Sequence, residues 1–97
     1  MVTARVGKHA YALRVRGDSM EPKFPEGVTI IVDPDASPVH GSFVVALLTD
    51  AEQVTFKQLV IDGRRYLKPL NPRYPVMEMD NRVAICGVVK QMIMSFD

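Results

Sequence analysis

The sequence predicts a mostly-β fold, a single small domain of about seven strands in twisted antiparallel sheets. Three observations support this prediction. Short apolar or alternating segments recur along the chain, and turns rich in Gly, Pro and Asp separate them. No segment has the periodicity of a helix longer than about two turns. The length of 97 residues also suits one domain with a modest core.

The chain divides into a short lead-in and one folded body. Residues 1–10 have no apolar periodicity and are expected to form an irregular N-terminal segment. Residues 11–97 are expected to form the domain. Its first strand covers residues 11–16, where apolar and polar side chains alternate, and Gly17 ends that strand.

The rest of the domain is expected to be built from strands as well. Two prolines and a glycine between residues 22 and 27 exclude a long helix there. Asp62-Gly63 predicts a tight hairpin turn. The last segment is interrupted by Gly87, so it is either one bent strand or two. The expected strands after the first are residues 28–33, 42–49, 54–61, 64–69 and 82–94.

Charge and composition exclude several functions. A formal net charge of +1 and a pI near 7.9 lack the strong positive field of a nucleic-acid-binding domain. The single cysteine, Cys86, cannot form an internal disulfide, which fits a reducing cytoplasm. Cys86 lies in an apolar run and is interpreted as a small buried core residue rather than a nucleophile. Neither a signal peptide nor an apolar run of membrane-spanning length is visible.

The stretch Gly17-Asp18-Ser19-Met20-Glu21-Pro22 carries the candidate nucleophile, Ser19. A serine hydroxyl attacks well only if a nearby base accepts its proton. His9 and His40 lie in loop-like sequence without an obvious Asp partner. Lys57 instead lies in an apolar strand, where an ammonium group would be poorly solvated. The sequence therefore predicts a Ser19/Lys57 dyad, although an exposed strand lysine is the alternative.

The energetics of this dyad are plausible. Keeping a lysine neutral at pH 7 costs about 4–5 kcal/mol. Burial can lower a lysine pKa by roughly 3–5 pH units, which is sufficient. In a strand, Lys57 shares its face with Thr55, Leu59 and Ile61. The two apolar residues are expected to exclude water, and Thr55 is expected to hydrogen-bond the amine.

Two residues beside Ser19 are given supporting roles. Backbone N–H groups around Ser19 and Met20 are a candidate oxyanion hole for a tetrahedral intermediate. The Met20 side chain is expected to pack beside the cleft without a chemical role. Asp18 is interpreted as a turn cap that bonds its own backbone, as Asp beside Gly often does.

Several motifs together resemble the C-terminal domain of the LexA, UmuD and phage-repressor family of self-cleaving serine peptidases. The resemblance runs in order over about residues 11–93. Its most specific parts are the Ser-Met pair, the lysine 38 positions later (57 minus 19), and a Leu-Asn-Pro-x-Tyr-Pro run like that of lambdoid prophage repressors. The matching segments are Leu13-Arg14-Val15-Arg16-Gly17-Asp18-Ser19-Met20-Glu21-Pro22, Phe24-Pro25-Glu26-Gly27, Ile31-Val32-Asp33-Pro34, Thr55-Phe56-Lys57-Gln58-Leu59 and Leu67-Lys68-Pro69-Leu70-Asn71-Pro72-Arg73-Tyr74-Pro75.

The resemblance implies a LexA/signal-peptidase-like fold, a cytoplasmic bacterial protein and a two-part repressor. Such repressors join a helix-turn-helix domain to this body by a linker, and contact with a RecA filament promotes cleavage of an Ala-Gly or Cys-Gly bond in the linker. No Ala-Gly occurs here, and Cys86-Gly87 lies inside a strand and is not the expected scissile bond. The chain is thus expected to be the catalytic and dimerising body, unable to cleave itself. Operator DNA would be bound only by the missing domain. No cofactor, metal or membrane is expected.

The resemblance also implies a homodimer, because repressors bind two operator half-sites. Residues 88–94, with Met79, Met92 and Met94, are the candidate interface, and ordinary core packing of the methionines is the alternative. Two other functions remain open. One is a UmuD-like accessory subunit of a translesion polymerase. The other is a dimerisation module whose Ser19 and Lys57 are idle.

Overall fold

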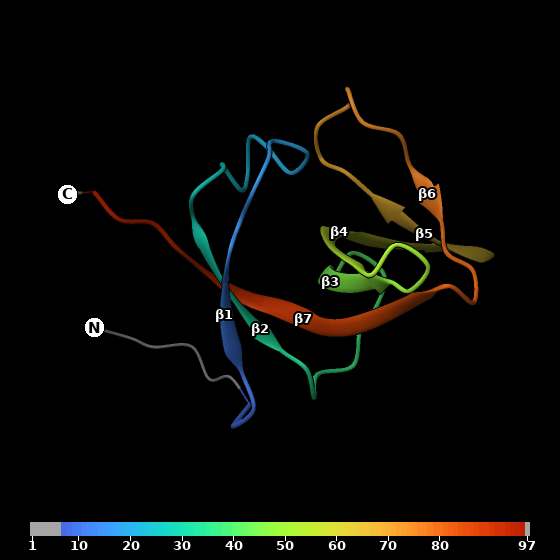
Figure 1. The fold of residues 1–97 in the computed structure, drawn as a ribbon, viewed down its shortest axis with the longest axis horizontal. Helices are drawn as coiled ribbons and strands as arrows, with labels where there is room; N and C mark the ends of the chain where they lie inside the picture. The colour runs from blue at the N-terminus through green and yellow to red at the C-terminus, as the bar shows by residue number, and fades with distance from the viewer. Residues whose placement is uncertain (1–6, 97) are drawn as a thin grey trace.

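A computed structural model describes residues 7–96 of the chain (Figure 1). All of its regular elements are strands, as the sequence predicts. Most of the expected lead-in lies outside the described residues, and residues 7–10 form a turn closed by a hydrogen bond from Ala10 N to Gly7 O. The strands are β1 Tyr11–Arg14, β2 Thr29–Asp33, β3 Phe43–Leu48, β4 Gln53–Asp62, β5 Arg64–Lys68, β6 Met77–Glu78 and β7 Val83–Ile93.

The seven strands form one antiparallel sheet in the order β1-β2-β7-β3-β4-β5-β6. Strand β7 is the longest strand, and it lies between β2 and β3, with which it pairs (Figure 1). Its pairing shifts once against β3, where Cys86 is the extra residue, and once against β2, where Lys90 is the extra residue. Bulges bend a strand. The segment expected as one bent strand or two is therefore a single strand with two bulges.

The core consists of two clusters on opposite faces of β3. Val45 belongs to the first cluster, together with Met20, Phe24 and Ile30. Val44 and Ala46 belong to the second, which also contains Leu59, Leu67 and Val88. Successive side chains of a strand point to opposite faces. A strand buried on both faces needs apolar residues throughout, which explains the continuous apolar run of residues 43–48.

Gly87 allows β7 to approach β2 closely. An added Cβ at this position would lie 2.5 Å from Val32 Cγ1 and 3.1 Å from the Asp33 carbonyl oxygen. Val32 is completely buried and has no space in which to move. We expect Gly87→Ala to lower the free energy of unfolding by about 1–3 kcal/mol, the usual cost of overpacking. Urea denaturation measures this change. A loss below about 0.5 kcal/mol would mean that β2 moves enough to accommodate the added methyl group.

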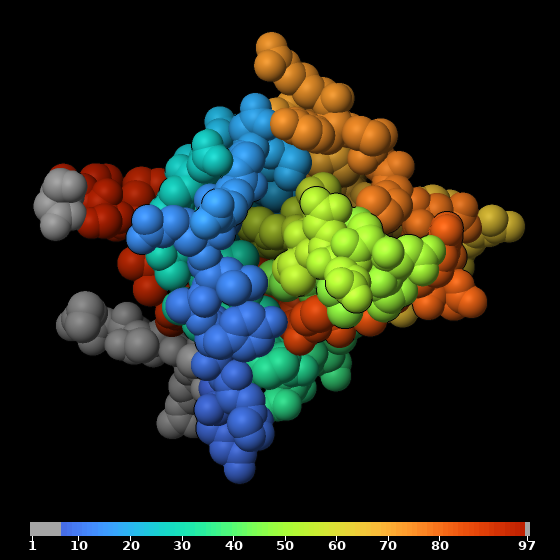
Figure 2. Space-filling model, viewed as in Figure 1, coloured from blue at the N-terminus to red at the C-terminus, as the bar shows by residue number. Residues whose placement is uncertain are grey.

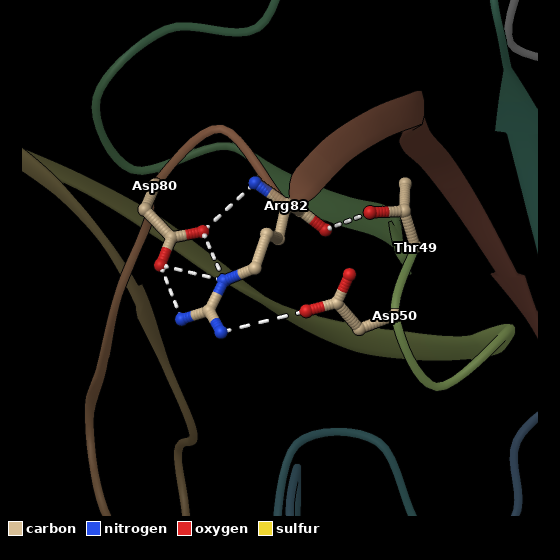
Figure 3. A network of polar contacts seen from close by, with 4 residues as sticks. All are labelled: Thr49, Asp50, Asp80 and Arg82. Atoms are coloured by element: carbon tan, nitrogen blue, oxygen red, sulfur yellow. Dashed lines mark hydrogen bonds and ion pairs between the residues drawn. The ribbon is translucent and has the colours of Figure 1, made fainter.

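A polar network fastens the turn after β3 to the segment before β7 (Figure 3). The Arg82 guanidinium contacts the Asp80 carboxylate at 2.7 Å and the Asp50 carboxylate at 3.4 Å. The Thr49 hydroxyl donates to the Arg82 carbonyl oxygen. Hydrogen bonds from Arg82 hold the pKa of Asp80 below its usual value. These side chains are exposed, so the network orients the turn more than it stabilises the domain.

Several element boundaries differ from those predicted. The first strand ends at Arg14, two residues early, although the Val15 backbone still makes hydrogen bonds with Val28 and Gly27 before the chain enters the turn that carries Ser19. Strand β6 was not predicted, since it has only two residues and follows a proline-rich loop. Glycine 63 alone connects β4 to β5, so the predicted hairpin is present. Among residues 7–96, no helix long and apolar enough to cross a membrane occurs.

Candidate functional site

The Ser19 turn is connected to the end of β1 by glycine and held by backbone hydrogen bonds. Gly17 has a φ of 78°, a conformation that other residues rarely adopt. Its N–H donates to the Glu26 side chain at 2.8 Å. After Ser19, the Phe24 N–H donates to the Met20 carbonyl oxygen at 2.9 Å. The Met20 side chain is 1% exposed and packs in the first cluster, as predicted, so it anchors the residue next to the nucleophile.

Strand β4 brings Lys57 to this turn. The Lys57 Nζ lies 3.1 Å from Ser19 Oγ, 2.9 Å from Thr55 Oγ1 and 3.1 Å from the Phe56 carbonyl oxygen. A neutral amine has two N–H donors and one lone pair. The Thr55 and Phe56 oxygens can each accept one donor. The lone pair is then available to the Ser19 hydroxyl.

Burial favours this neutral form. Desolvation of the half-buried amine lowers the pKa of Lys57 from its ordinary value. Lys57 is paired with Val44 across the sheet, and Leu59 on the same face is completely buried. Ile61, which was also expected to exclude water, is 41% exposed near the end of β4 and does not contribute. The apolar residues that line the cleft together with Lys57 include Met20, Val45 and Phe56.

The two side chains open into a cleft between β1 and the start of β4. Its volume is about 450 Å³. Figure 2 shows the blue atoms of the β1 region and the yellow-green atoms near the start of β4 on its two sides. Leu13, Ile30 and Val45 supply part of its apolar lining. Among residues 7–96, β1 is at the edge of the sheet and pairs with β2 alone, so these residues leave its other edge for hydrogen bonding with a peptide.

The backbone donors expected to form an oxyanion hole make no hydrogen bond with another described residue. Within residues 7–96, the N–H groups of Gly17, Glu21 and Phe24 donate hydrogen bonds in this turn, and those of Ser19 and Met20 do not. A developing oxyanion next to Ser19 Oγ needs donors at such a position. The arrangement is compatible with the predicted role of these two N–H groups.

The other candidate groups lie elsewhere. His9 has an Asp partner that the sequence did not suggest, because its Nδ1 lies 2.6 Å from Asp35 Oδ2. The His40 Nδ1 accepts a hydrogen bond from the Ile61 N–H at 2.9 Å. Neither histidine lines the cleft. Cys86 is only half-buried and packs against the first cluster from β7. Within the described part of the chain, no group of His, Cys, Asp and Glu residues is arranged to hold a metal ion.

The loop after β5 also reaches the Ser19 turn. The Asn71 N–H donates to the Ser19 carbonyl oxygen at 3.0 Å, and the Asn71 side chain donates to the Asp18 carbonyl oxygen at 3.0 Å. The Tyr74 hydroxyl donates to the Asp18 carboxylate, which raises the pKa of Tyr74. The prediction that Asp18 caps its own backbone with its carboxylate was therefore wrong.

An antiparallel β domain with a serine and a lysine in contact at a cleft is the arrangement expected of an all-β serine peptidase domain. Comparison with protein families agrees, because residues 1–90 match the family described as Peptidase S24-like. The chain belongs to this family, which in general consists of self-cleaving serine peptidases. The predicted family is therefore confirmed.

Curated relatives are transcriptional regulators. The chain is 50% identical over 101 residues to the HTH-type transcriptional regulator for conjugative element SXT of Vibrio cholerae, covering 98% of this chain and 47% of the regulator. It is 45% identical over 92 residues to the repressor protein C2 of Salmonella phage P22, covering 90% of this chain and 43% of the repressor. It is also 43% identical over 86 residues to the prophage repressor CohE of Escherichia coli K12, covering 86% and 38%. The chain thus spans less than half the length of these three relatives.

Proposed function

We propose that the chain is the autoproteolytic and dimerisation domain of a repressor of prophage or conjugative-element genes. Ser19 is the nucleophile and Lys57 is its general base. Their substrate is the linker that joins a DNA-binding domain to this body, and contact with a RecA filament stimulates the cut that induces the repressed genes. The observation that carries the proposal is the contact of 3.1 Å between Lys57 Nζ and Ser19 Oγ.

The reaction follows from this geometry. As Ser19 Oγ attacks the carbonyl carbon of the scissile bond, its proton passes to the lone pair of the Lys57 amine. The N–H groups of Ser19 and Met20 stabilise the oxyanion. When the intermediate collapses, the Lys57 ammonium returns the proton to the leaving amine. Water then attacks the acyl-serine with Lys57 again as the base, which releases the new carboxylate and restores Ser19.

The shape of the cleft supports an extended peptide as the substrate. A linker segment along the free edge of β1 can form backbone hydrogen bonds as an added strand. The repressor function is favoured over a polymerase accessory subunit because relatives with 43–50% identity are named as regulators or repressors.

A fluorophosphonate probe tests the peptidase function on the chain as it is. The probe forms a phosphorus–oxygen bond with an activated serine and releases fluoride. We expect one adduct, at Ser19 by peptide mass spectrometry, and none on Ser37, Ser42 or Ser95. Ser19→Ala is the control and should remain unlabelled. If the unchanged chain gains no adduct between pH 7 and 10, the peptidase proposal fails and the idle dimerisation module replaces it.

Thr55→Val removes a hydrogen-bond acceptor of the Lys57 amine while nearly keeping the side-chain shape. The Thr55 hydroxyl lies 2.9 Å from Nζ and holds the amine toward Ser19. We expect the rate of Ser19 labelling to fall by about tenfold, the effect of one hydrogen bond at a reacting group. Thr55→Ser, which keeps the hydroxyl, should retain most of the rate. Equal rates for Thr55→Val and the unchanged chain would show that Thr55 has no part in the dyad.

The dimer is proposed to form through the end of β7. Met92, Ile93 and Met94 are 40%, 52% and 41% exposed, whereas Met79 is partly buried and packs against the second cluster. Within the described part of the chain, β3 pairs with residues 83–88 of β7, so residues 89–93 of β7 pair with β2 but not with β3. We expect Ile93→Glu to convert a dimer into a monomer in sedimentation equilibrium. A monomeric unchanged chain, or a dimer that survives this substitution, would argue against this interface.

A further inference from the structure

The Ser19 turn depends on a loop more than fifty residues away in sequence. Asn71 and Tyr74 both contact Asp18, the residue before Ser19, at sequence separations of 53 and 56 residues. The turn's own backbone hydrogen bonds run from the Glu21 N–H to the Asp18 carbonyl oxygen at 3.2 Å and from the Phe24 N–H to the Met20 carbonyl oxygen at 2.9 Å. On its other side Ser19 is connected through Asp18 to Gly17, whose backbone is permissive. The loop adds two side-chain contacts to Asp18 on that side.

The loop is rigid enough to supply this support. Its first residue, Pro69, is buried, and Leu70 packs against the first cluster. Two internal hydrogen bonds then close a turn: the Tyr74 N–H donates to the Asn71 carbonyl oxygen at 3.1 Å, and the Arg73 N–H donates to Asn71 Oδ1 at 3.0 Å. The Asn71 amide is thus held by its own loop before it reaches Asp18. Groups oriented in this way position a neighbour with little entropy cost.

We infer that Asn71 and Tyr74 are positioning residues for Ser19. The Asn71 amide holds the Asp18 carbonyl oxygen, and the Tyr74 hydroxyl holds the Asp18 carboxylate. Together they set the position of the Ser19 hydroxyl opposite Lys57. This inference rests on the proposed function, because it concerns how well the same dyad is aligned.

Two substitutions remove these contacts with little other change. Asn71→Asp keeps an oxygen for the Arg73 N–H but replaces the amide donor by a carboxylate that repels the Asp18 carbonyl oxygen. Tyr74→Phe removes only the hydroxyl. Arg73→Gln is the matched control. Arg73 donates to Asn71 through its backbone N–H, and this substitution keeps that N–H. Each variant is compared with the unchanged chain for fluorophosphonate labelling at several probe concentrations, for the fraction labelled at completion, and for Tm.

The expected result is a lower maximum labelling rate without weaker probe binding. Asn71→Asp should lower the maximum rate by about tenfold, and Tyr74→Phe by about threefold, as for a lost hydrogen bond. The half-saturating probe concentration should stay within about twofold, and labelling should still reach completion. A loop that only stabilised the fold would instead reduce the Tm and the labelled fraction while the remaining molecules reacted at the normal rate.

The outcomes separate this inference from the function on which it rests. No labelling of the unchanged chain overturns both proposals. Normal labelling of the unchanged chain with the same maximum rate in Asn71→Asp and Tyr74→Phe overturns the positioning role alone. A loss of rate of equal size in Arg73→Gln would also overturn it, because the effect would then come from any change in the loop.

Discussion

Replacing Lys57 by methionine is expected to slow fluorophosphonate labelling of Ser19 by about 10²–10⁴-fold, the usual contribution of a general base. Methionine has a similar length but cannot accept the Ser19 proton. Lys57→Arg should slow labelling to a similar degree, because a guanidinium stays protonated at all accessible pH values and cannot accept the Ser19 proton. The measurement is the labelling rate by intact-protein mass spectrometry, with probe in excess.

The control for this experiment is Lys68→Met. Lys68 is an exposed lysine on the neighbouring strand β5, so its replacement should leave labelling unchanged. Folding offers a second check. Because burial lowers the pKa of Lys57, the folded state disfavours the charged amine, and this penalty is present at neutral pH. Lys57→Met should therefore not reduce the Tm at pH 7. If labelling stays within threefold of the unchanged chain, Lys57 is not the base.

The pH dependence has a defined sign. The base is active when Lys57 is neutral, so labelling should rise with pH and level off once the amine has lost its proton. Since burial lowers the pKa of Lys57, that plateau should begin below the ordinary value for lysine, about 10.4. A rate that rises steadily past this value would indicate an unperturbed amine or attack by a base from solvent.

Leu59→Ala should be among the most destabilising single substitutions in the domain. Leu59 is completely buried in the second cluster, where it is packed with Leu67 and Val44. Removal of its side chain deletes apolar contacts and leaves a cavity that the surrounding sheet can fill only in part. We expect the free energy of unfolding to fall by about 2–5 kcal/mol, a large share of the stability of so small a domain. Urea denaturation followed by circular dichroism measures this change.

Ile61→Ala is the matched control for this prediction. Ile61 is on the same strand and the same face, two residues further on, but it is 41% exposed. Its replacement should cost less than about 1.5 kcal/mol, because little of the side chain leaves an apolar environment. Similar losses for the two variants would contradict the core described here, in which burial on this face ends at Leu59.

Much of the secondary structure could be predicted because the local signals were strong. The apolar run of residues 43–48 predicted a strand, and the Asp62-Gly63 pair predicted a hairpin turn. Each of these signals lies within a few neighbouring residues. The Ser19/Lys57 pairing was predicted from chemistry, since a serine needs a base and an apolar strand favours an uncharged amine. Thr55 was predicted from alternation alone, and it lies within hydrogen-bond distance of Lys57.

Other features could not be predicted because their partners are distant in sequence. The contacts of Asp18 with Asn71 and Tyr74, and of His9 with Asp35, arise only when separate loops meet. Pro72 and Pro75 restrict the backbone of the loop after β5, and a polar side chain in such a loop is a signal worth testing. Strand β6 has too few residues for any periodic pattern.

The sequence by itself determined the class of the fold and the two residues that we propose as its catalytic pair. Side-chain alternation sets which residues of a strand face inward, and the apolar surroundings of Lys57 mark it among the lysines. Only the tertiary structure decided how the pair is held. The two bulges in β7 bend one long strand through the middle of the sheet, and the loop after β5 reaches back to Asp18. Such long-range contacts depend on how the whole sheet is assembled, which no short stretch of residues can encode.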